Sequence, residues 1–186
     1  MYELHKHEQY FFDEQTLDHL ARFAAAYSAI CCLCAPLLGQ ALEDRGIRAR
    51  VLDIDTRFNH LRGFQHYDIY RPEWLGERFD LIICDPPFFK VSLSQLFHAV
   101  RMISQYDYTQ PLLICYLARR ASNVIGTFSP FGLVQTGYHP NYQTVQSVEQ
   151  NDICVFGNLS AEEHDRLSSG DAGDRSFFSR KQGAGS

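Results

Sequence analysis

The sequence predicts an α/β domain whose sheet is mainly parallel and ends in an antiparallel pair of strands. Short apolar runs of the kind that fill buried strands alternate with segments whose apolar residues recur at helical spacing. The last two apolar runs have only a polar loop between them, which indicates antiparallel pairing. The 186 residues, of which 45% are hydrophobic and 13% aromatic, suit one globular domain with a sizeable core.

The two ends of the chain differ in composition from the part between them. Residues 1–8 are polar and predict a loose N-terminus. From residue 160 onward Ser, Gly, Asp, Arg and Glu dominate, and apart from Phe177 and Phe178 almost nothing could build a core. We therefore expect the domain to occupy residues 9–159 and residues 160–186 to form a flexible tail.

The first predicted helix follows Asp13, whose carboxylate can cap the free amide groups at a helix N-terminus. Its apolar stripe, at spacings of three and four residues, consists of Leu17, Leu20, Ala21 and Ala24. Three aromatic residues, Tyr10, Phe11 and Phe12, precede the cap. They can attach the helix to the core, or they can form one wall of a substrate pocket in which Tyr10 and Phe11 contact the substrate. Both interpretations stay open at this point.

A predicted strand over residues 29–34 leads into a helix that begins at Pro36, since proline suits the first helical turn, and ends at Gly46. A strand, a tight turn and a helix N-terminus together form the place where nucleotide-like ligands bind in doubly wound folds. The glycine-rich GxG pattern is absent from this turn. Its absence argues against an ordinary NAD or ATP site.

The second predicted strand, residues 50–54, ends in a pair of acidic residues, Asp53 and Asp55. Strand alternation places both carboxylates on the same face. A carboxylate there can accept hydrogen bonds from two ribose hydroxyl groups, so either residue could be a ribose ligand. Each could equally belong to a solvated strand end. A third short strand over residues 64–67 is predicted to end at Asp68.

The fourth predicted strand, residues 81–84, runs into the turn formed by Asp85, Pro86, Pro87 and Phe88. Open α/β sheets bind their ligands just beyond the carboxyl ends of such strands. The later predicted elements are a helix over residues 92–104 capped by Ser92, a strand over 112–116, a helix through 120–125, and final strands over 132–138 and 152–156.

The turn after the fourth strand carries the groups needed to hold an amino group. The Asp85 carboxylate and the Pro86 carbonyl can each accept one N–H hydrogen bond, and the fixed φ of Pro86 and Pro87 holds the carbonyls in place. Phe88 can lie flat against a base, worth about 1–3 kcal/mol in stacking. A lysine stem could instead lie between Phe88 and Tyr10; with an ordinary pKa of about 10.4, that lysine needs a separate route for its proton. A rigid turn without function is the alternative interpretation.

Charge and composition narrow the classes of partner. The formal net charge of −5 and a pI near 5.9 argue against a basic scaffold that coats nucleic acid, although a local basic patch could suffice. The six cysteines lie in or beside apolar runs, and no His-based metal pattern is present, so we expect buried thiols and no metal site. Without a signal peptide or an apolar run of membrane-spanning length, we expect no membrane partner and a cytoplasmic, reducing compartment.

Five segments in a fixed order resemble one known family. These segments are Gln9 to Phe12, Cys34-Ala35-Pro36, Asp53 to Phe58, Tyr67-Asp68 and Asp85 to Phe88. Together they resemble the N6-adenine methylase-like family of seven-stranded, S-adenosylmethionine-dependent methyltransferases. That family includes the lysine methyltransferase of translation elongation factor 1A and the zinc-knuckle adenine methyltransferase of ribosomal RNA. The resemblance extends over about residues 9–158.

The resemblance implies a Rossmann-like methyltransferase fold with S-adenosylmethionine as the cofactor. It implies that Cys34, Ala35 and Pro36 replace the glycine-rich turn beside that cofactor. Asp53 or Asp55 would then bind its sugar, and Asp68 would lie near its adenine.

Methyl transfer requires mainly that a nitrogen lone pair be positioned correctly, which is the task that Asp85, Pro86, Pro87 and Phe88 suit. The acceptor stays open between adenine N6 of RNA or DNA, which stacking on Phe88 favours slightly, and a protein lysine. The loop over residues 138–142 differs from both relatives and carries over no catalytic residue, but we expect it to overhang the pocket and help choose the acceptor. A third possibility is a methyltransferase-like binding module without catalysis, against which the intact Asp85 to Phe88 turn argues. An NAD-dependent or hydrolytic α/β enzyme lacks support, because GxGxxG, GxSxG and a convincing triad are all absent.

Overall fold

The computed structural model describes residues 2–3, 9–145 and 151–169. In this part of the chain seven strands form one sheet in the order β3-β2-β1-β4-β5-β7-β6. The first five strands are parallel, and β7 pairs antiparallel with both β5 and β6. The strands are β1 (Ile30–Leu33), β2 (Ala49–Asp53), β3 (Phe64–His66), β4 (Leu81–Cys84), β5 (Leu112–Leu117), β6 (Val134–Gln135) and β7 (Ile153–Gly157). The prediction of a mainly parallel sheet with a C-terminal antiparallel pair is confirmed.

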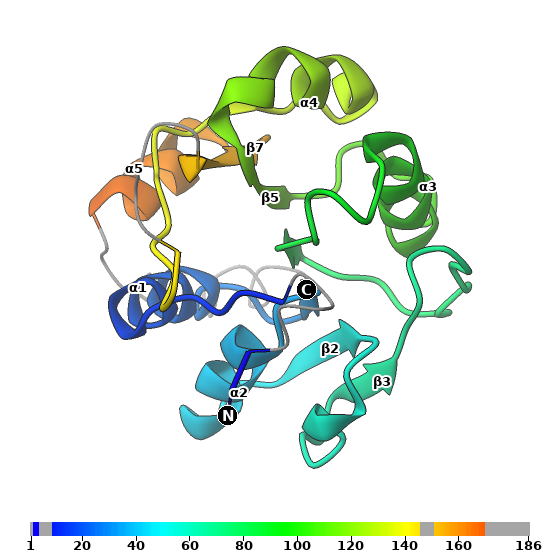
Figure 1. Cartoon of the computed structure of the whole chain (residues 1–186), viewed down its shortest axis with the longest axis vertical. Coiled ribbons are helices and arrows are strands. Elements are labelled where there is room, and N and C mark those ends of the chain that lie inside the picture. The colour runs from blue at the N-terminus through cyan, green and yellow to red at the C-terminus, as the bar shows by residue number, and fades with distance from the viewer. Residues whose placement is uncertain (1, 4–8, 146–150, 170–186) are drawn as a thin grey trace, which may run out of the picture.

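Helices cover both faces of the sheet (Figure 1). On one face α1 packs against both α2 and α5, and on the other face α3 packs against α4. The parallel strands are buried along their whole length in β1, β4 and β5, as a sheet covered on both faces requires. The helices are α1 (Glu14–Ala24), α2 (Pro36–Asp44), α3 (Leu93–Ile103), α4 (Ala121–Thr127) and α5 (Ala161–Ser169).

The helix boundaries follow from capping residues. The Asp13 carboxylate accepts a hydrogen bond from the backbone amide of Thr16 at 2.8 Å and caps α1. Ser92 caps α3 in the same way through the amide of Gln95. Pro36 occupies the first turn of α2, where its missing N–H costs no helical hydrogen bond.

Residues 160–186 differ from the prediction of a flexible tail. Residues 161–169 form α5, and residues 170–186 lie outside the described part. Leu167 is fully buried, and its carbonyl accepts a hydrogen bond from His19 Nε2 of α1 at 2.6 Å. The Tyr27 hydroxyl donates to Glu163 of α5 at 2.7 Å. The prediction is wrong for this helix because tertiary contacts, and not an apolar stripe, hold it in place.

Two other predictions need adjustment. The strand expected over residues 132–138 is reduced to β6, since Gly132 and Gly137 adopt left-handed backbone angles on either side of it. The expected loose N-terminus over residues 1–8 lies outside the described residues except for Tyr2 and Glu3.

The described residues hold no disulfide, no membrane-spanning helix and no metal-binding cluster. Five of the six cysteines are buried and Cys34 is half-buried, all as free thiols. Over residues 2–3, 9–145 and 151–169, no helix is long and apolar enough to cross a bilayer. The same residues hold no group of three or more His, Cys, Asp or Glu side chains suited to a metal ion.

Candidate active site

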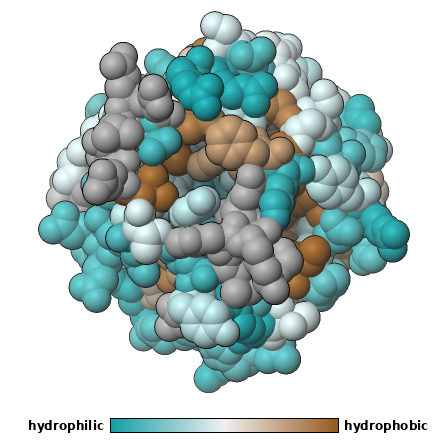
Figure 2. All heavy atoms as spheres, in the orientation of Figure 1, coloured by the Kyte–Doolittle hydropathy of each residue, from teal (hydrophilic) through white to brown (hydrophobic). Residues whose placement is uncertain are grey.

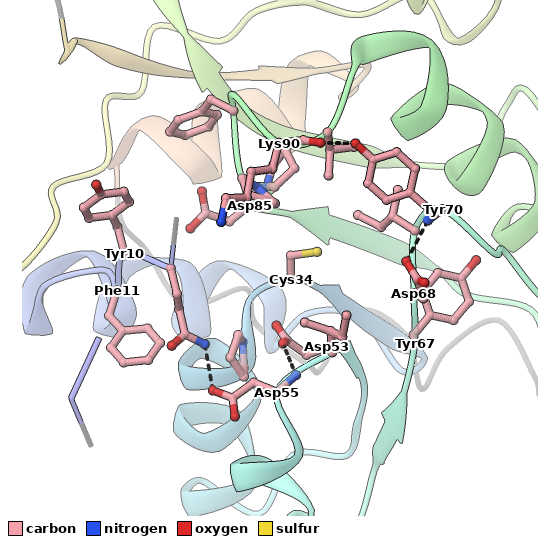
Figure 3. A pocket seen from close by; sticks show the side chains of 18 of the residues that line it. Tyr10, Phe11, Cys34, Asp53, Asp55, Tyr67, Asp68, Tyr70, Asp85 and Lys90 are labelled. Carbon is pink, nitrogen blue, oxygen red and sulfur yellow. Dashed lines mark hydrogen bonds between the residues drawn. The ribbon is translucent and has the colours of Figure 1, made fainter. Parts of the chain in front are cut away.

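A cavity of about 420 Å³ opens at the carboxyl ends of β1, β2 and β4. Figure 3 shows Asp53 and Asp55 on one side of it and Asp85 and Lys90 on the opposite side, with Cys34 between them. In Figure 2 hydrophobic side chains gather toward the centre of the face shown and hydrophilic ones toward its margin. The predicted site residues that line the cavity are Tyr10, Phe11, Cys34, Pro36, Asp53, Asp55, Asp68, Asp85, Pro86, Pro87 and Phe88.

The turn between β1 and α2 forms the floor of this cavity. Cys34 adopts a left-handed backbone conformation with φ of 56°, and its amide donates to the Leu52 carbonyl of β2 at 2.9 Å. Cys34 and Pro36 line the cavity, whereas Ala35 is buried in the core between them. Helix α2 approaches the sheet so closely that a Cβ on Gly39 would lie 2.2 Å from a methyl carbon of Val51. Glycine at position 39 therefore allows the close helix–sheet packing that the absent GxG motif provides in other folds.

Asp53 ends β2 with its carboxylate facing the cavity. Asp53 is 7% exposed, and its Oδ1 accepts a hydrogen bond from the backbone amide of Asp55 at 2.8 Å. Burial raises the pKa of Asp53 to about 6, although backbone hydrogen bonds from Asp55 and Ile54 oppose the rise. Asp53 thus stands in the cavity with no cationic partner in direct contact among the described residues.

Asp55 has a different environment, although it lines the same cavity. Its Oδ2 accepts a hydrogen bond from Arg57 Nη2 at 2.7 Å and another from Gln9 Nε2 at 2.8 Å, and Arg57 Nε lies 3.0 Å from both carboxyl oxygens. Burial acts to raise the pKa of Asp55, but the hydrogen bonds from Arg57 and Gln9 outweigh it and hold this pKa below its usual value. Asp55 is therefore an ionised anchor.

Arg57 also ties the N-terminal segment to this wall. Its guanidinium donates to the Gln9 side-chain carbonyl at 2.7 Å and to the backbone carbonyl of Tyr2 at 3.0 Å, and it lies over the Tyr2 ring. Glu3 accepts a hydrogen bond from the Phe11 amide at 2.8 Å. These contacts place Tyr2, Glu3 and the aromatic residues beside the cavity.

The third wall comes from the loop after β3. The Asp68 carboxylate accepts a hydrogen bond from the Tyr70 amide at 2.9 Å, which fixes a local turn. The Tyr70 hydroxyl in turn donates to the backbone carbonyl of Lys90. This contact joins the β3 loop to the loop after β4, so the two sides of the cavity are linked (Figure 3).

The turn from Asp85 to Phe88 is held on both sides. The Asp85 amide donates to the Leu33 carbonyl of β1 at 3.1 Å. The Phe88 carbonyl accepts from the Tyr116 hydroxyl of β5 at 3.2 Å, and the two rings meet edge to face at 5.3 Å. The turn thus has a fixed backbone, with the Phe88 ring packed against β5.

Asp85 has one described side-chain hydrogen-bond donor, the hydroxyl of Tyr142, which lies 2.7 Å from its Oδ1. Burial raises the pKa of Asp85 to about 8, the Tyr142 hydrogen bond opposes this rise, and the nearby Asp53 charge adds to it. The neutral form of this carboxyl group therefore predominates at neutral pH, and the ionised form becomes equal to it only near pH 8.

A family model described as "Probable N6-adenine methyltransferase" matches residues 3–161. The chain belongs to this family. Its sheet order and its cavity at the carboxyl ends of β1, β2 and β4 agree with that assignment. The prediction of an S-adenosylmethionine-dependent methyltransferase is thus confirmed at the level of family and fold.

Solved structures share the fold of this N6-adenine methyltransferase family member at low sequence identity. Human N-acetylserotonin methyltransferase in complex with S-adenosylmethionine is 13% identical, with a TM-score of 0.50, covering 79% of this chain and 52% of its own. Magnesium protoporphyrin IX methyltransferase from Synechocystis, with S-adenosylmethionine bound, is 12% identical, with a TM-score of 0.53 and coverage of 78% and 79%. A protein of Pyrococcus horikoshii described provisionally as an RNA methyltransferase is 18% identical, with a TM-score of 0.54 and coverage of 86% and 91%.

The N6-adenine methyltransferase family member spans only about half of the human enzyme. Among curated protein sequences, none matches it significantly.

Several residues of this methyltransferase were not assigned to the site from the sequence, and four of them have clear contacts there. Gln9, Lys90 and Tyr142 line the cavity, and Arg57 holds Asp55 there. Arg57 and Gln9 stand inside segments that carried the family resemblance, so their positions offered a signal. The loop over residues 138–142 was expected to overhang the pocket, but no role could be assigned to Tyr142 within it, because its place depends on contacts with a segment about 130 residues away in the chain.

Proposed function

We propose that the chain is an S-adenosylmethionine-dependent N-methyltransferase whose acceptor is the exocyclic N6 amino group of an adenine in RNA or DNA. The observation that carries this proposal is the position of the Asp85 to Phe88 turn in the same cavity as the buried Asp53. One wall suits a ribose and the facing wall suits an amino group. The family assignment supports the reaction class, and the choice of acceptor is the proposal.

The residues on the β1 and β2 side fit the cofactor. Asp53 presents a carboxylate that is buried without a cation, and two ribose hydroxyl groups would supply the hydrogen bonds that this group lacks. Asp55 is already engaged by Arg57 and Gln9, so we assign the ribose contact to Asp53 and a supporting role to Asp55. Cys34 and Pro36 would lie against the body of the cofactor, and Asp68 against its adenine end. When bound, S-adenosylmethionine supplies an electrophilic methyl group.

The residues on the β4 side fit an aromatic amine. Asp85 and the Pro86 carbonyl would accept hydrogen bonds from the two N–H groups, which draws the nitrogen lone pair out of conjugation with the ring. After the nitrogen has gained the methyl group it would release one of these protons to the ionised Asp85 or to solvent. Phe88 and Tyr10 offer aromatic faces to the base, and Phe11 is 3% exposed behind them. Because positioning supplies most of the effect in such transfers, a rigid turn is more useful here than a flexible loop.

Lys90 favours adenine over lysine as the acceptor. Its exposed side chain lies at the cavity, where it would attract the phosphates that flank a base and repel the ammonium group of a lysine substrate. A lysine must also lose a proton before it attacks, whereas an adenine amino group is already neutral. A protein lysine is the second candidate acceptor. The observation in its favour is the pKa of Asp85 near 8, which would let this carboxylate accept the proton that the lysine ammonium group must lose.

A methyl-transfer assay on fractionated cell lysate tests the proposal. The purified chain is incubated with tritiated S-adenosylmethionine and lysate, and the product is treated with nuclease or with protease. We expect the label to become soluble with nuclease only. Label released only by protease would identify a protein lysine as the acceptor. The enzyme assignment would be overturned if no label is transferred and calorimetry detects no binding of S-adenosylmethionine. The exposed substitution Asp165→Ala on α5, remote from the cavity residues, is the control variant.

A further inference from the structure

Tyr142 reaches the cavity from a segment that is fixed against the N-terminal part of the domain. It forms an antiparallel bridge with Phe12, and its ring packs on the Phe12 ring at 5.1 Å. The Asp13 amide donates to the Asn141 carbonyl at 2.9 Å, and the Gln143 amide donates to the Phe11 carbonyl at 2.8 Å. Because hydrogen bonds hold the backbone on both sides of Tyr142, its 9% exposed side chain has little freedom.

The hydroxyl of this fixed ring meets Asp85. It lies 2.7 Å from Oδ1, and burial raises the pKa of Tyr142 well above its usual range, so the hydroxyl stays protonated and acts as the donor. None of the residues that the structure describes donates a hydrogen bond to the second oxygen, Oδ2. One oxygen of Asp85 is thus occupied by the protein and one faces the cavity.

The other titratable groups around Asp85 do not replace Tyr142 as a hydrogen-bond donor to its carboxyl group. These groups are Asp53 of β2, Cys34 of the β1–α2 turn, Cys84 of β4 and Cys115 of β5. Burial raises the pKa of each of these thiols, so each keeps its S–H, which is only a weak donor, and none of them hydrogen-bonds Asp85 in the described part of the chain. Asp53 cannot donate once it is ionised. Tyr142 is therefore the group that orients the Asp85 carboxyl.

We infer that Tyr142 is a positioning residue of the acceptor site: it holds Oδ1 of Asp85, so that Oδ2 and the Pro86 carbonyl are the two acceptors presented to a primary amine. This inference rests on the proposed function. Two acceptors match the two N–H hydrogens of an unmethylated amino group. An amine that already carries one methyl group has a single N–H, leaves one acceptor unsatisfied, and is a poorer substrate. Tyr142 thereby also contributes to selection of the unmethylated acceptor.

The variant Tyr142→Phe tests this role, since it removes the hydroxyl and keeps the ring that packs on Phe12. Tyr138→Phe, on the same loop and outside the residues that line the cavity, is the matched control. The pKa of Asp85 is measured by carbon NMR on the labelled carboxyl group, assigned with Asp85→Asn. We expect this pKa to rise by about one pH unit in Tyr142→Phe and to stay unchanged in Tyr138→Phe, because a donor to the ionised form is lost.

The pH dependence of kcat/KM supplies the second readout. Since Asp85 accepts hydrogen bonds best when ionised, the acidic limb of the profile should move to higher pH in Tyr142→Phe. Near pH 7 kcat should fall at least about tenfold, while S-adenosylmethionine affinity stays within about twofold. A merely structural role would lower the activity at every pH equally.

The outcomes separate the two proposals. An active wild type whose Tyr142→Phe variant keeps the same acidic limb and the same Asp85 titration would overturn the role of Tyr142 and leave the proposed function intact. A folded wild type that transfers no methyl group at any pH would overturn the proposed function, whatever the NMR titration shows.

Discussion

Asp55 and Asp85 line the same cavity and have opposite surroundings. Asp55 accepts charged and neutral hydrogen bonds from Arg57 and Gln9, which hold its pKa below the usual value against the effect of burial. Among the described residues, the neutral hydroxyl of Tyr142 is the only side-chain donor to Asp85, and burial raises the pKa of Asp85 to about 8. The two environments therefore differ in the donors Arg57 and Gln9, which only Asp55 has, and in the stronger effect of burial on Asp85.

This comparison shows how one pocket can use the same residue type for two tasks. A carboxylate that is paired with a cation keeps its charge and serves as a fixed structural anchor. A carboxyl group that is shielded from water and has no cationic partner among the described residues can change its charge state and respond to what fills the cavity. The first kind of group supports the cofactor wall, and the second kind suits an acceptor amine.

The substitution Asp85→Ala should give the largest effect on the acceptor side. We expect kcat to fall by at least about 100-fold, because the amine loses a hydrogen-bond acceptor that positions it, while the Kd of S-adenosylmethionine stays within about twofold. Initial rates with labelled cofactor and isothermal titration calorimetry measure the two quantities. Turnover close to that of wild type would show that the wrong carboxyl group has been assigned to the acceptor.

Asp53→Ala should show the reverse behaviour. The Kd of S-adenosylmethionine is expected to rise about 10- to 100-fold, since a doubly accepting carboxylate is lost from the ribose site. Calorimetric titration measures the change, with Asp165→Ala as the control. Unchanged affinity in Asp53→Ala together with weakened binding in Asp55→Ala would exchange the roles of the two acids.

Arg57→Ala should make the environment of Asp55 resemble that of Asp85. Losing the bonds to Asp55, Gln9 and Tyr2 should cost about 1–2 kcal/mol of unfolding free energy and weaken S-adenosylmethionine binding less than Asp53→Ala does. Thermal unfolding and titration calorimetry measure both effects. The control is Arg62→Ala, whose 90% exposed side chain lies 3.7 Å from Glu43 and should contribute almost nothing. Equal losses in the two variants would contradict the proposed importance of the Arg57 cluster.

Asp85→Asn should stabilise the cofactor-free protein in a pH-dependent way. The pKa of Asp85 in the folded state, about 8, lies above its ordinary value of 3.8. Between pH 3.8 and pH 8 the folded state therefore binds more protons than the unfolded state, so the stability of the wild type falls as the pH rises through this range. The asparagine variant lacks this loss, and its Tm advantage should grow between pH 5 and pH 8 to about 3–6 °C. Calorimetric scans at both pH values measure it.

Asp55→Asn is the opposite control for that experiment. Because the folded pKa of Asp55 is lowered, its ionised form stabilises the fold above its ordinary pKa and this stabilisation is lost as the pH falls. Its asparagine variant should therefore be destabilised most at neutral pH. A Tm advantage of Asp85→Asn that does not change with pH would contradict the raised pKa of Asp85.

Elements with strong local signals were predictable from the sequence. The run Leu81–Cys84 is apolar throughout and forms β4 over those residues, and the Ser92 cap begins α3 where expected. Elements that depend on distant partners were not. Only Leu167 of α5 is fully buried, and the helix is held by hydrogen bonds from His19 and Tyr27 that no local pattern shows.

The residues of the candidate site likewise fall into those that local motifs predict and those whose place depends on distant contacts. Most of its residues stand in short motifs at strand ends, where the fold class itself predicts a ligand site. The distinction between Asp53 and Asp55 could not be made from alternation, because it depends on the direction of the Arg57 side chain. The loop over residues 138–142 was expected at the pocket, but the contact of Tyr142 with Asp85 could not be predicted, since it spans 57 positions of the chain and requires the bridge to Phe12.

The antiparallel pairing of β5 with β7 has a consequence for the order in which the protein forms during synthesis. A chain made from its N-terminus completes β1, β2 and β4, with Asp53 and Asp85, well before Tyr142 and β7 emerge. Until β7 arrives, the six apolar residues of β5 form an open edge of the nascent sheet. Open apolar edges pair readily with other chains, so the interval between β5 and β7 is the time at which a growing chain is most exposed to aggregation.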